Sequence, residues 1–114
     1  MNQEHIASAY DRDLEAVQAM IMKMGGLVEA AILRAAESLE KRDEEEAEAV
    51  RRADAAIDAL EQQVNEDCAR LIALRQPTAG DLRTILTVMK IASNLERIGD
   101  YAKNMGKRTS VLVQ

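Results

Sequence analysis

The only proline of the 114-residue chain lies in the stretch Arg75-Gln76-Pro77-Thr78-Ala79-Gly80-Asp81. The residue before a proline is driven out of the α-helical region, so a helix must end there. Apolar residues at helical spacing lead up to this stretch and resume after it, and Thr78 or Asp81 is placed to cap the second of these helices. The stretch therefore predicts a tight turn between two long helices.

A second break lies at Lys41-Arg42-Asp43, where three polar residues interrupt the pattern and Asp43 is placed to cap the next helix. Before this break, apolar residues fall on one arc of a helix that we expect from about Asp11 to Lys41. The three predicted inner arcs carry Leu14, Val17, Met20, Ile21, Met24, Leu27, Val28, Ala31, Ile32, Ala35 and Leu39; then Val50, Ala53, Ile57, Leu60, Val64, Cys68, Leu71 and Leu74; then Leu82, Ile85, Val88, Met89, Ala92, Leu95, Gly99, Ala102 and Met105. Helices of about 30 residues joined by short loops must fold back on one another. The sequence predicts an all-α, antiparallel up-down-up three-helix bundle.

The composition narrows the class of protein. Lys and Arg (15) against Asp and Glu (20) give a net charge of −5, and a pI near 4.9 disfavours binding to nucleic acid. The single cysteine, Cys68, has no partner for a disulfide, which favours a reducing compartment. No run approaches the roughly 18 apolar residues of a membrane span, and the first residues do not resemble a signal peptide. We therefore expect a cytoplasmic protein without membrane insertion.

Five acidic residues occupy positions where the helical pattern calls for apolar ones. Asp54, Asp58 and Glu61 lie within or at the edge of the apolar arc of the helix before Pro77, and Glu96 and Asp100 lie on the arc of the helix after it. Carboxylates placed towards a low-dielectric seam repel one another unless a cation or a shared proton compensates. These acids are candidates for a binding site.

Counting from Pro77 brings four of these acids to matching heights. Asp58 lies 19 residues before the proline and Glu96 lies 19 after it, while Asp54 lies 23 before and Asp100 lies 23 after. In an antiparallel pair the partners should be level, about 30 Å from the turn. We expect Asp54, Asp58, Glu96 and Asp100 to form one cluster.

A cluster of oxygen ligands without a nearby histidine or thiolate suits a hard divalent or ferric ion, and its identity stays open among Fe, Mg, Mn, Ca and Zn. A di-iron oxidase would supply Glu-x-x-His motifs, and the only histidine here is His5. Two weaker candidate ligands are Glu61, a turn away, and Glu29 of the first helix, near the level of Asp58. In the alternative without metal, the carboxylates pair with cations on neighbouring turns: Arg51, Arg97 or Lys103.

Gly25 and Gly26 lie inside the first predicted helix, where each costs about 1 kcal/mol relative to alanine. Such a cost predicts close helix packing or a kink, with contact to a partner as the alternative.

Four separated motifs together resemble the PhoU family of phosphate-signalling regulators over nearly the whole chain. They are Met24-Gly25-Gly26-Leu27-Val28-Glu29, Asp54-Ala55-Ala56-Ile57-Asp58, the stretch from Arg75 to Arg83, and Asn94-Leu95-Glu96-Arg97-Ile98-Gly99-Asp100. The resemblance implies a three-helix bundle with spectrin-like packing, present twice in full-length members. Residues 1–114 resemble the first repeat, and the helical pattern at residues 109–114 has no stop signal, so we expect a longer protein.

The resemblance also implies a function. Family members carry Glu/Asp-x-x-x-Asp motifs that hold metal, and these correspond here to Asp54 with Asp58 and to Glu96 with Asp100. The family is thought to form homodimers and to link the ATPase of the phosphate ABC transporter (PstB-like) to a sensor histidine kinase (PhoR-like), keeping the phosphate-starvation response off. We thus expect a negative regulator of that response.

No nucleophile constellation or phosphate-binding loop appears in the sequence, so we expect an adaptor and not an enzyme. Arg83, Lys90 and Arg97 share the polar arc of the third helix, where a partner could dock. We expect no direct phosphate site without metal, because the acidic cluster repels phosphate. Two alternatives remain: a carboxylate-bridged metalloenzyme, and a purely structural helical interaction module.

Overall fold

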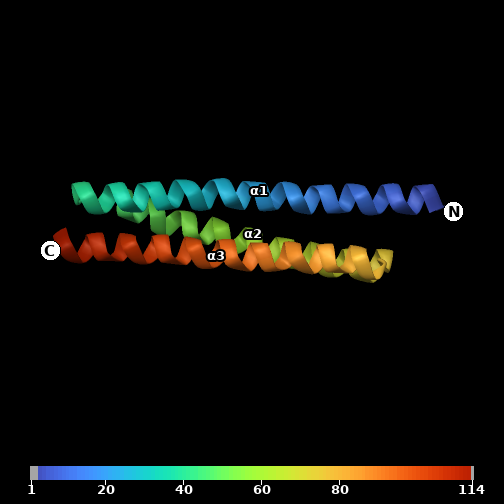
Figure 1. Ribbon diagram of the computed structural model, residues 1–114. Coiled ribbons are helices and arrows are strands. Elements are labelled where there is room, and N and C mark those ends of the chain that lie inside the picture. The colour runs from blue at the N-terminus through green and yellow to red at the C-terminus, as the bar shows by residue number, and fades with distance from the viewer. Residues whose placement is uncertain (1–2, 114) are drawn as a thin grey trace.

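The computed structural model describes residues 3–113, and it describes side chains from Ser8 onward. Three helices make up this part of the chain: α1 (Gln3–Lys41), α2 (Glu44–Arg75) and α3 (Ala79–Val113). They lie side by side and alternate in direction, forming a rod of 64 × 17 × 16 Å (Figure 1). Residues 3–113 contain no strand, so the prediction of an all-α three-helix bundle is confirmed.

Both turns form where the sequence places them, and capping side chains fix their ends. The Asp43 carboxylate accepts hydrogen bonds from the backbone N–H groups of Glu45 (3.0 Å) and Glu46 (3.2 Å) at the start of α2. Of the two candidate caps for α3, Thr78 has this role, since its hydroxyl accepts a bond from the Asp81 N–H at 3.3 Å. Gln76 ends α2 in a left-handed conformation, with φ of 45°.

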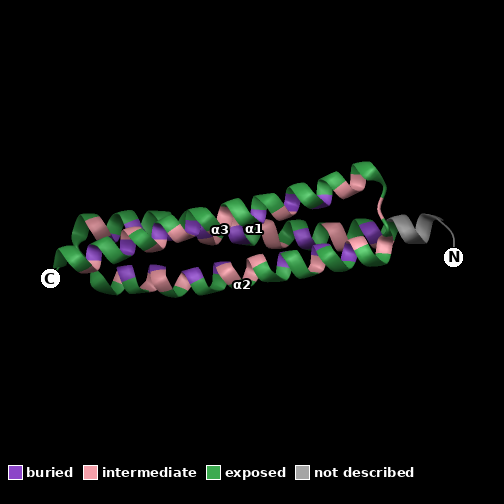
Figure 2. Cartoon of the chain, turned by 90° about the horizontal axis from the view of Figure 1, so that it is seen from below, coloured by how far each residue is buried: buried purple, intermediate pink, exposed green. Residues whose placement is uncertain are grey.

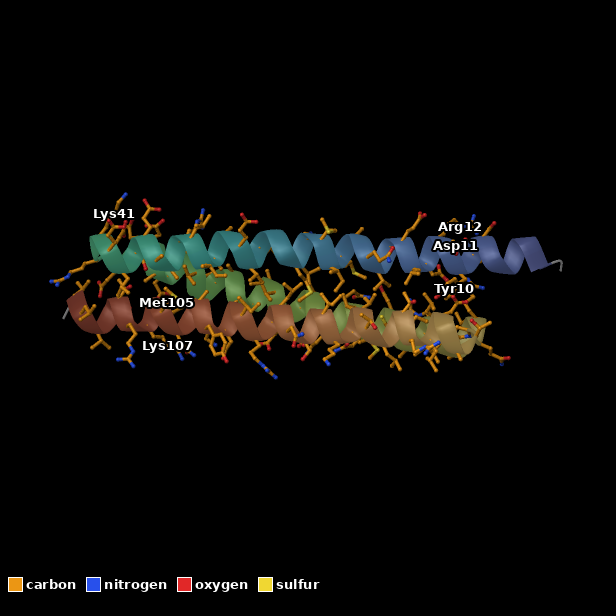
Figure 3. All side chains as sticks on the ribbon, in the orientation of Figure 1. Tyr10, Asp11, Arg12, Lys41, Met105 and Lys107 are labelled. Carbon is orange, nitrogen blue, oxygen red and sulfur yellow. The ribbon has the colours of Figure 1, made fainter. Side chains whose placement is uncertain are left out.

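The predicted start of the first helix is wrong: α1 begins at Gln3, not near Asp11. Residues 3–10 contain neither proline nor glycine, and Tyr10 continues the buried arc one turn before Leu14. The Tyr10 hydroxyl donates to the backbone carbonyl of Asp81 at 3.4 Å, which joins the first part of α1 to the start of α3 (Figure 3). The side chain of His5 lies outside the described residues.

Buried residues follow one stripe along each helix and meet along the axis of the rod (Figure 2). The main core holds the larger side chains, among them Met24, Ile57 and Ile85. Nearer the α1–α2 turn, small residues pack together, and the hydroxyls of Ser38 and Thr109 hydrogen bond at 3.1 Å between α1 and α3. The core at this end is therefore built from smaller side chains than the main core.

Two residues assigned to the inner arcs are exposed. Leu74 is 64% exposed because it lies in the last turn of α2, where it lines an open groove with Asp13 and Arg75. Ile32 lies at the edge of the buried stripe of α1 and is also exposed. Periodicity finds the arc but overestimates its width.

The two glycines of α1 do not serve internal packing, so that prediction is wrong. A Cβ atom added at Gly25 or at Gly26 would meet nothing within 4 Å, and α1 continues through both positions. The alternative, contact with a partner, stays a prediction.

By length and composition, one described helical segment, Ser8–Lys41, is apolar enough to cross a membrane. Core helices of proteins that stay in water have the same length and composition.

Candidate metal centre between α2 and α3

Five acidic side chains line the contact between α2 and α3, and we call them the acidic seam: Asp54, Asp58 and Glu61 from α2, and Glu96 and Asp100 from α3. Asp54 is buried and the other four are half-buried, unlike the exposed Glu44, Glu45 and Glu48 at the start of α2. The antiparallel hairpin around Pro77 brings the two helices together at this height. The seam therefore concentrates negative charge where water is partly excluded.

Close approach of the two helices depends on glycines of α3. A Cβ atom at Gly99 would lie 3.1 Å from the Cδ1 atom of Ile57, and one at Gly106 would lie 3.2 Å from the backbone oxygen of Ala47. Larger residues at these positions would push α3 away from α2. Gly99 directly precedes Asp100. The contact between Gly99 and Ile57 therefore fills the core and also sets the position of Asp100 in the seam.

Asp58 and Glu96 face each other across the seam, at the matching heights that the count from Pro77 predicts. Burial, a hydrogen bond with the Asp58 carboxyl and the charges of Asp58, Glu61 and Asp100 together raise the pKa of Glu96. All of these neighbours carry negative charge. Glu96 therefore lies where a nearby positive charge would offset the surrounding carboxylates.

Asp54 has a different environment from the other four acids. Its Oδ2 atom lies 3.4 Å from the Nζ atom of Lys103 on α3, and its buried Oδ1 atom has no hydrogen-bond partner. This is one of the ion pairs that the alternative without metal predicts. The four acids of the predicted cluster therefore divide into Glu96 with its neighbours Asp58 and Asp100, and Asp54, which is tied to a lysine, in place of one closed cluster.

The donor set fits a hard cation in its chemistry. Among the side chains described here, no three Asp, Glu, His or Cys residues gather closely enough to hold an ion as they stand. The buried Oδ1 atom of Asp54 nevertheless lacks a partner, and Glu96 has a raised pKa beside Asp58, which are the conditions that a bound cation relieves.

The two weaker candidates differ in their positions. Glu61 lies close enough for its charge to act on Glu96, so it belongs to the seam. Glu29 is exposed, and its neighbours on the same side of α1, Gly26 and Leu33, are exposed too. The structure does not bring Glu29 to the seam, because a level position along the rod does not make its side chain face α2 and α3.

The outer side of α3 carries the predicted docking residues. Arg83, Lys90 and Arg97 are all exposed and recur every seven residues, which aligns them along one stripe. Arg108, which is also exposed, extends the stripe toward the end of α3. None of the ion pairs found among residues 8–113 includes these four cations. Figure 3 shows Lys107 on the side of α3 away from α1.

Comparison with known proteins places this arrangement in a family. Residues 21–109 match the PhoU domain. The chain is 45% identical over 103 residues to the phosphate-specific transport system accessory protein PhoU homolog of Aquifex aeolicus, covering 90% of this chain and 47% of that protein. It is 43% identical over 108 residues to the protein of the same name from Zymomonas mobilis, covering 95% of this chain and 46% of that protein.

The chain spans about half the length of these curated relatives, and the matched region contains all five seam acids. On the evidence of both matches, the chain belongs to the PhoU domain family.

Proposed function

We propose that this domain is part of an accessory protein of a phosphate-specific transport system, and that it is a non-enzymatic negative regulator of the response to phosphate starvation. The observation that carries the proposal is the match of residues 21–109 to the PhoU domain, together with the relatives' names. In this role the protein links the ATPase of a phosphate transporter to a sensor histidine kinase, acts as a homodimer and works in the cytoplasm. A buried, unpaired Cys68 agrees with a reducing compartment.

The acidic seam is the proposed metal site of this regulator. Asp58 and Glu96 supply the central oxygens, with Asp54 and Asp100 one turn along, and the bound ion supplies the positive charge that the seam lacks. Carboxylates from two helices would then be drawn together by one ion, so metal would strengthen the contact between α2 and α3. The contact between the half-buried Asp58 and Glu96 supports this part of the proposal.

A metal titration followed by thermal unfolding tests the site. After treatment with EDTA, adding Mn²⁺ or Mg²⁺ is expected to raise the Tm, and free metal at 100 times its Kd stabilises the fold by about 2.7 kcal/mol. Replacing both α3 acids (Glu96→Gln with Asp100→Asn) should abolish the increase.

The matched control removes two exposed acids of α2 (Glu44→Gln with Glu45→Gln) and changes the net charge equally. It should keep the metal-dependent increase. If no metal changes the Tm of the native sequence, the metal site is rejected. That result would favour the alternative of a purely structural helical interaction module. Turnover of a small substrate that disappears with Glu96 would favour the metalloenzyme.

The stripe of Arg83, Lys90 and Arg97 is the proposed docking surface for the ATPase or the kinase. Exposed Leu86 lies between Arg83 and Lys90, and exposed Tyr101 lies one turn beyond Arg97, so the stripe offers apolar area as well as charge. Its chemistry fits an acidic surface, since rows of opposite charge steer association and set its register.

Pull-down of the transporter ATPase and the kinase by the whole protein tests this surface. Neutralising the stripe (Arg83→Gln, Lys90→Gln and Arg97→Gln together) should reduce capture about ten-fold or more, and added salt should weaken what remains. The control neutralises three exposed cations of α1: Arg12→Gln, Lys23→Gln and Arg34→Gln. Equal capture by both triple variants would show that only net charge matters.

A further inference from the structure

Lys103 extends the acidic seam by one turn of α3 beyond Asp100. It follows Glu96 by seven residues and Asp100 by three, so all three share the side of α3 that meets α2. Its side chain is 32% exposed, while the side chain of Asp54 that it contacts is only 7% exposed. A cation thus reaches from the surface into the seam.

The Lys103 ammonium is held by charge and not by a close hydrogen bond. The distance from Nζ to Asp54 Oδ2 is 3.4 Å, longer than the usual range of about 2.7–3.2 Å for an N–H···O bond. Leaving a buried carboxylate without any cation is strongly unfavourable. The contact therefore gives the buried Asp54 carboxyl a cation on its Oδ2 side, while its Oδ1 atom has no hydrogen-bond partner.

A metal ion and the Lys103 ammonium would compete for the same carboxylate. Ligand oxygens approach Mg²⁺, Mn²⁺ or Ca²⁺ to about 2.0–2.6 Å, so an ion on Asp54 would lie within a few ångströms of the ammonium and repel it. Because the lysine side chain is flexible and one-third exposed, it can swing to water without disturbing the helix.

We propose that Lys103 is a tethered counter-ion that occupies the Asp54 end of the seam until a multivalent metal displaces it, and so determines which ions bind and how tightly. This inference rests on the proposed metal function of the seam. Na⁺ and K⁺ carry only the single charge that the ammonium already supplies, so they gain little by displacing it. A divalent or ferric ion brings more charge to the carboxylates and can replace the lysine.

Measuring Mn²⁺ binding by the full chain, after EDTA treatment and in 0.1 M KCl, tests this competition. In Lys103→Met the competing charge is gone, and Mn²⁺ is expected to bind on the order of ten-fold more tightly. Lys107 is exposed and lies one turn further along α3. Lys107→Met removes an equal charge there, and it should change the affinity less than about two-fold. K⁺ should also compete with Mn²⁺ more strongly in Lys103→Met than in the native sequence.

Repeating the substitutions in a protein that carries Asp54→Asn separates direct competition from a structural effect. In Asp54→Asn the contact with Lys103 is lost, so adding Lys103→Met should no longer improve Mn²⁺ binding beyond the change seen with Lys107→Met. An NMR signal from the Lys103 side chain should also shift when diamagnetic Mg²⁺ saturates the native protein, and not in Asp54→Asn. These readouts stay informative if Lys103→Met lowers the stability.

The outcomes separate the two proposals. Equal Mn²⁺ affinity in the native sequence, Lys103→Met and Lys107→Met would overturn the role of Lys103 while leaving the metal site intact. Binding only in Lys103→Met would support the competition and reject metal binding as a function of the natural sequence. Binding in none of them would overturn both.

Discussion

Gly106 and Gly25 both lie inside long helices, but their surroundings differ. A Cβ atom at Gly106 would lie 3.2 Å from the backbone oxygen of Ala47, and backbone cannot swing aside as a flexible side chain can. A Cβ atom at Gly25 would enter open space. The same substitution should therefore have opposite effects at the two positions.

Gly106→Ala is expected to destabilise the fold by about 1–2 kcal/mol, because the clash separates α3 from α2 and outweighs the gain in helix propensity. Gly25→Ala is expected to stabilise it by about 0.5–1 kcal/mol, since alanine restricts the unfolded chain and meets no obstacle. Urea unfolding of both variants measures the difference. Destabilisation by Gly25→Ala would show that this surface is already in contact with something in solution.

Glu96 makes stability depend on pH. Its pKa is raised in the folded state by burial and by the neighbouring carboxylates, so between the unfolded and folded pKa values the native state binds more protons. Stability must then fall as pH rises through this interval. Glu96→Gln should remove this fall and be more stable than the native sequence at neutral pH in EDTA.

Unfolding curves in EDTA between pH 4 and pH 8 check this prediction. The two proteins should converge at the acidic end, where the native Glu96 is protonated. A larger advantage of Glu96→Gln at pH 4 than at pH 8 would contradict the assignment. Asp67→Asn, which also changes one half-buried acid of the bundle but lies outside the seam, serves as the control.

At the scale of the elements, the ends of the helices are fixed by local chemistry. Asp43 satisfies two backbone N–H groups at the start of α2, and Glu44, Glu45 and Glu46 place further negative charge on the same helix end. Thr78 has the corresponding role at α3. These caps determine where the chain reverses and therefore which residues of α2 and α3 are level.

Asp43→Ala is expected to cost about 1 kcal/mol, because two N–H groups at the start of α2 lose their side-chain acceptor. Asp43→Ser should recover most of that loss, since its hydroxyl can accept the same bonds. Thermal unfolding and circular dichroism of the three proteins measure both effects. Equal losses for alanine and serine would indicate that the charge of Asp43 matters more than its capping bonds.

At the scale of the whole molecule, one residue joins the three helices. Ile57 is completely buried on α2 and lies against Gly99 of α3, where Val28 of α1 also approaches. The helices are otherwise long and narrow, so the rod depends on such shared contacts along its length.

Ile57→Ala is therefore expected to cost about 2–5 kcal/mol, through lost burial and the cavity that remains. Leu74→Ala removes a leucine side chain that is mostly exposed, and should cost within about 0.5 kcal/mol. Urea unfolding compares the two variants. Similar losses would show that the end of α2 packs against something beyond residues 3–113.

Most of the fold follows from local signals in the sequence. The apolar period of each helix, the break at Lys41-Arg42-Asp43 and the turn at Pro77 act within a few residues, so the three helices and their directions can be predicted. The start of α1 could not, because residues 3–10 are compatible with a helix but carry only weak periodicity until Tyr10.

The sequence by itself also determined that Asp58 and Glu96 would meet, because equal distances from the turn become equal heights in an antiparallel hairpin. Only the tertiary structure decided that Asp54 is held by Lys103, that Glu29 points away from the seam, and that Gly106 and not Gly25 packs against a neighbour. Periodicity gives the direction of a side chain on its own helix. What it meets there depends on how the neighbouring helices are rotated and how closely they approach, which contacts distant in sequence determine.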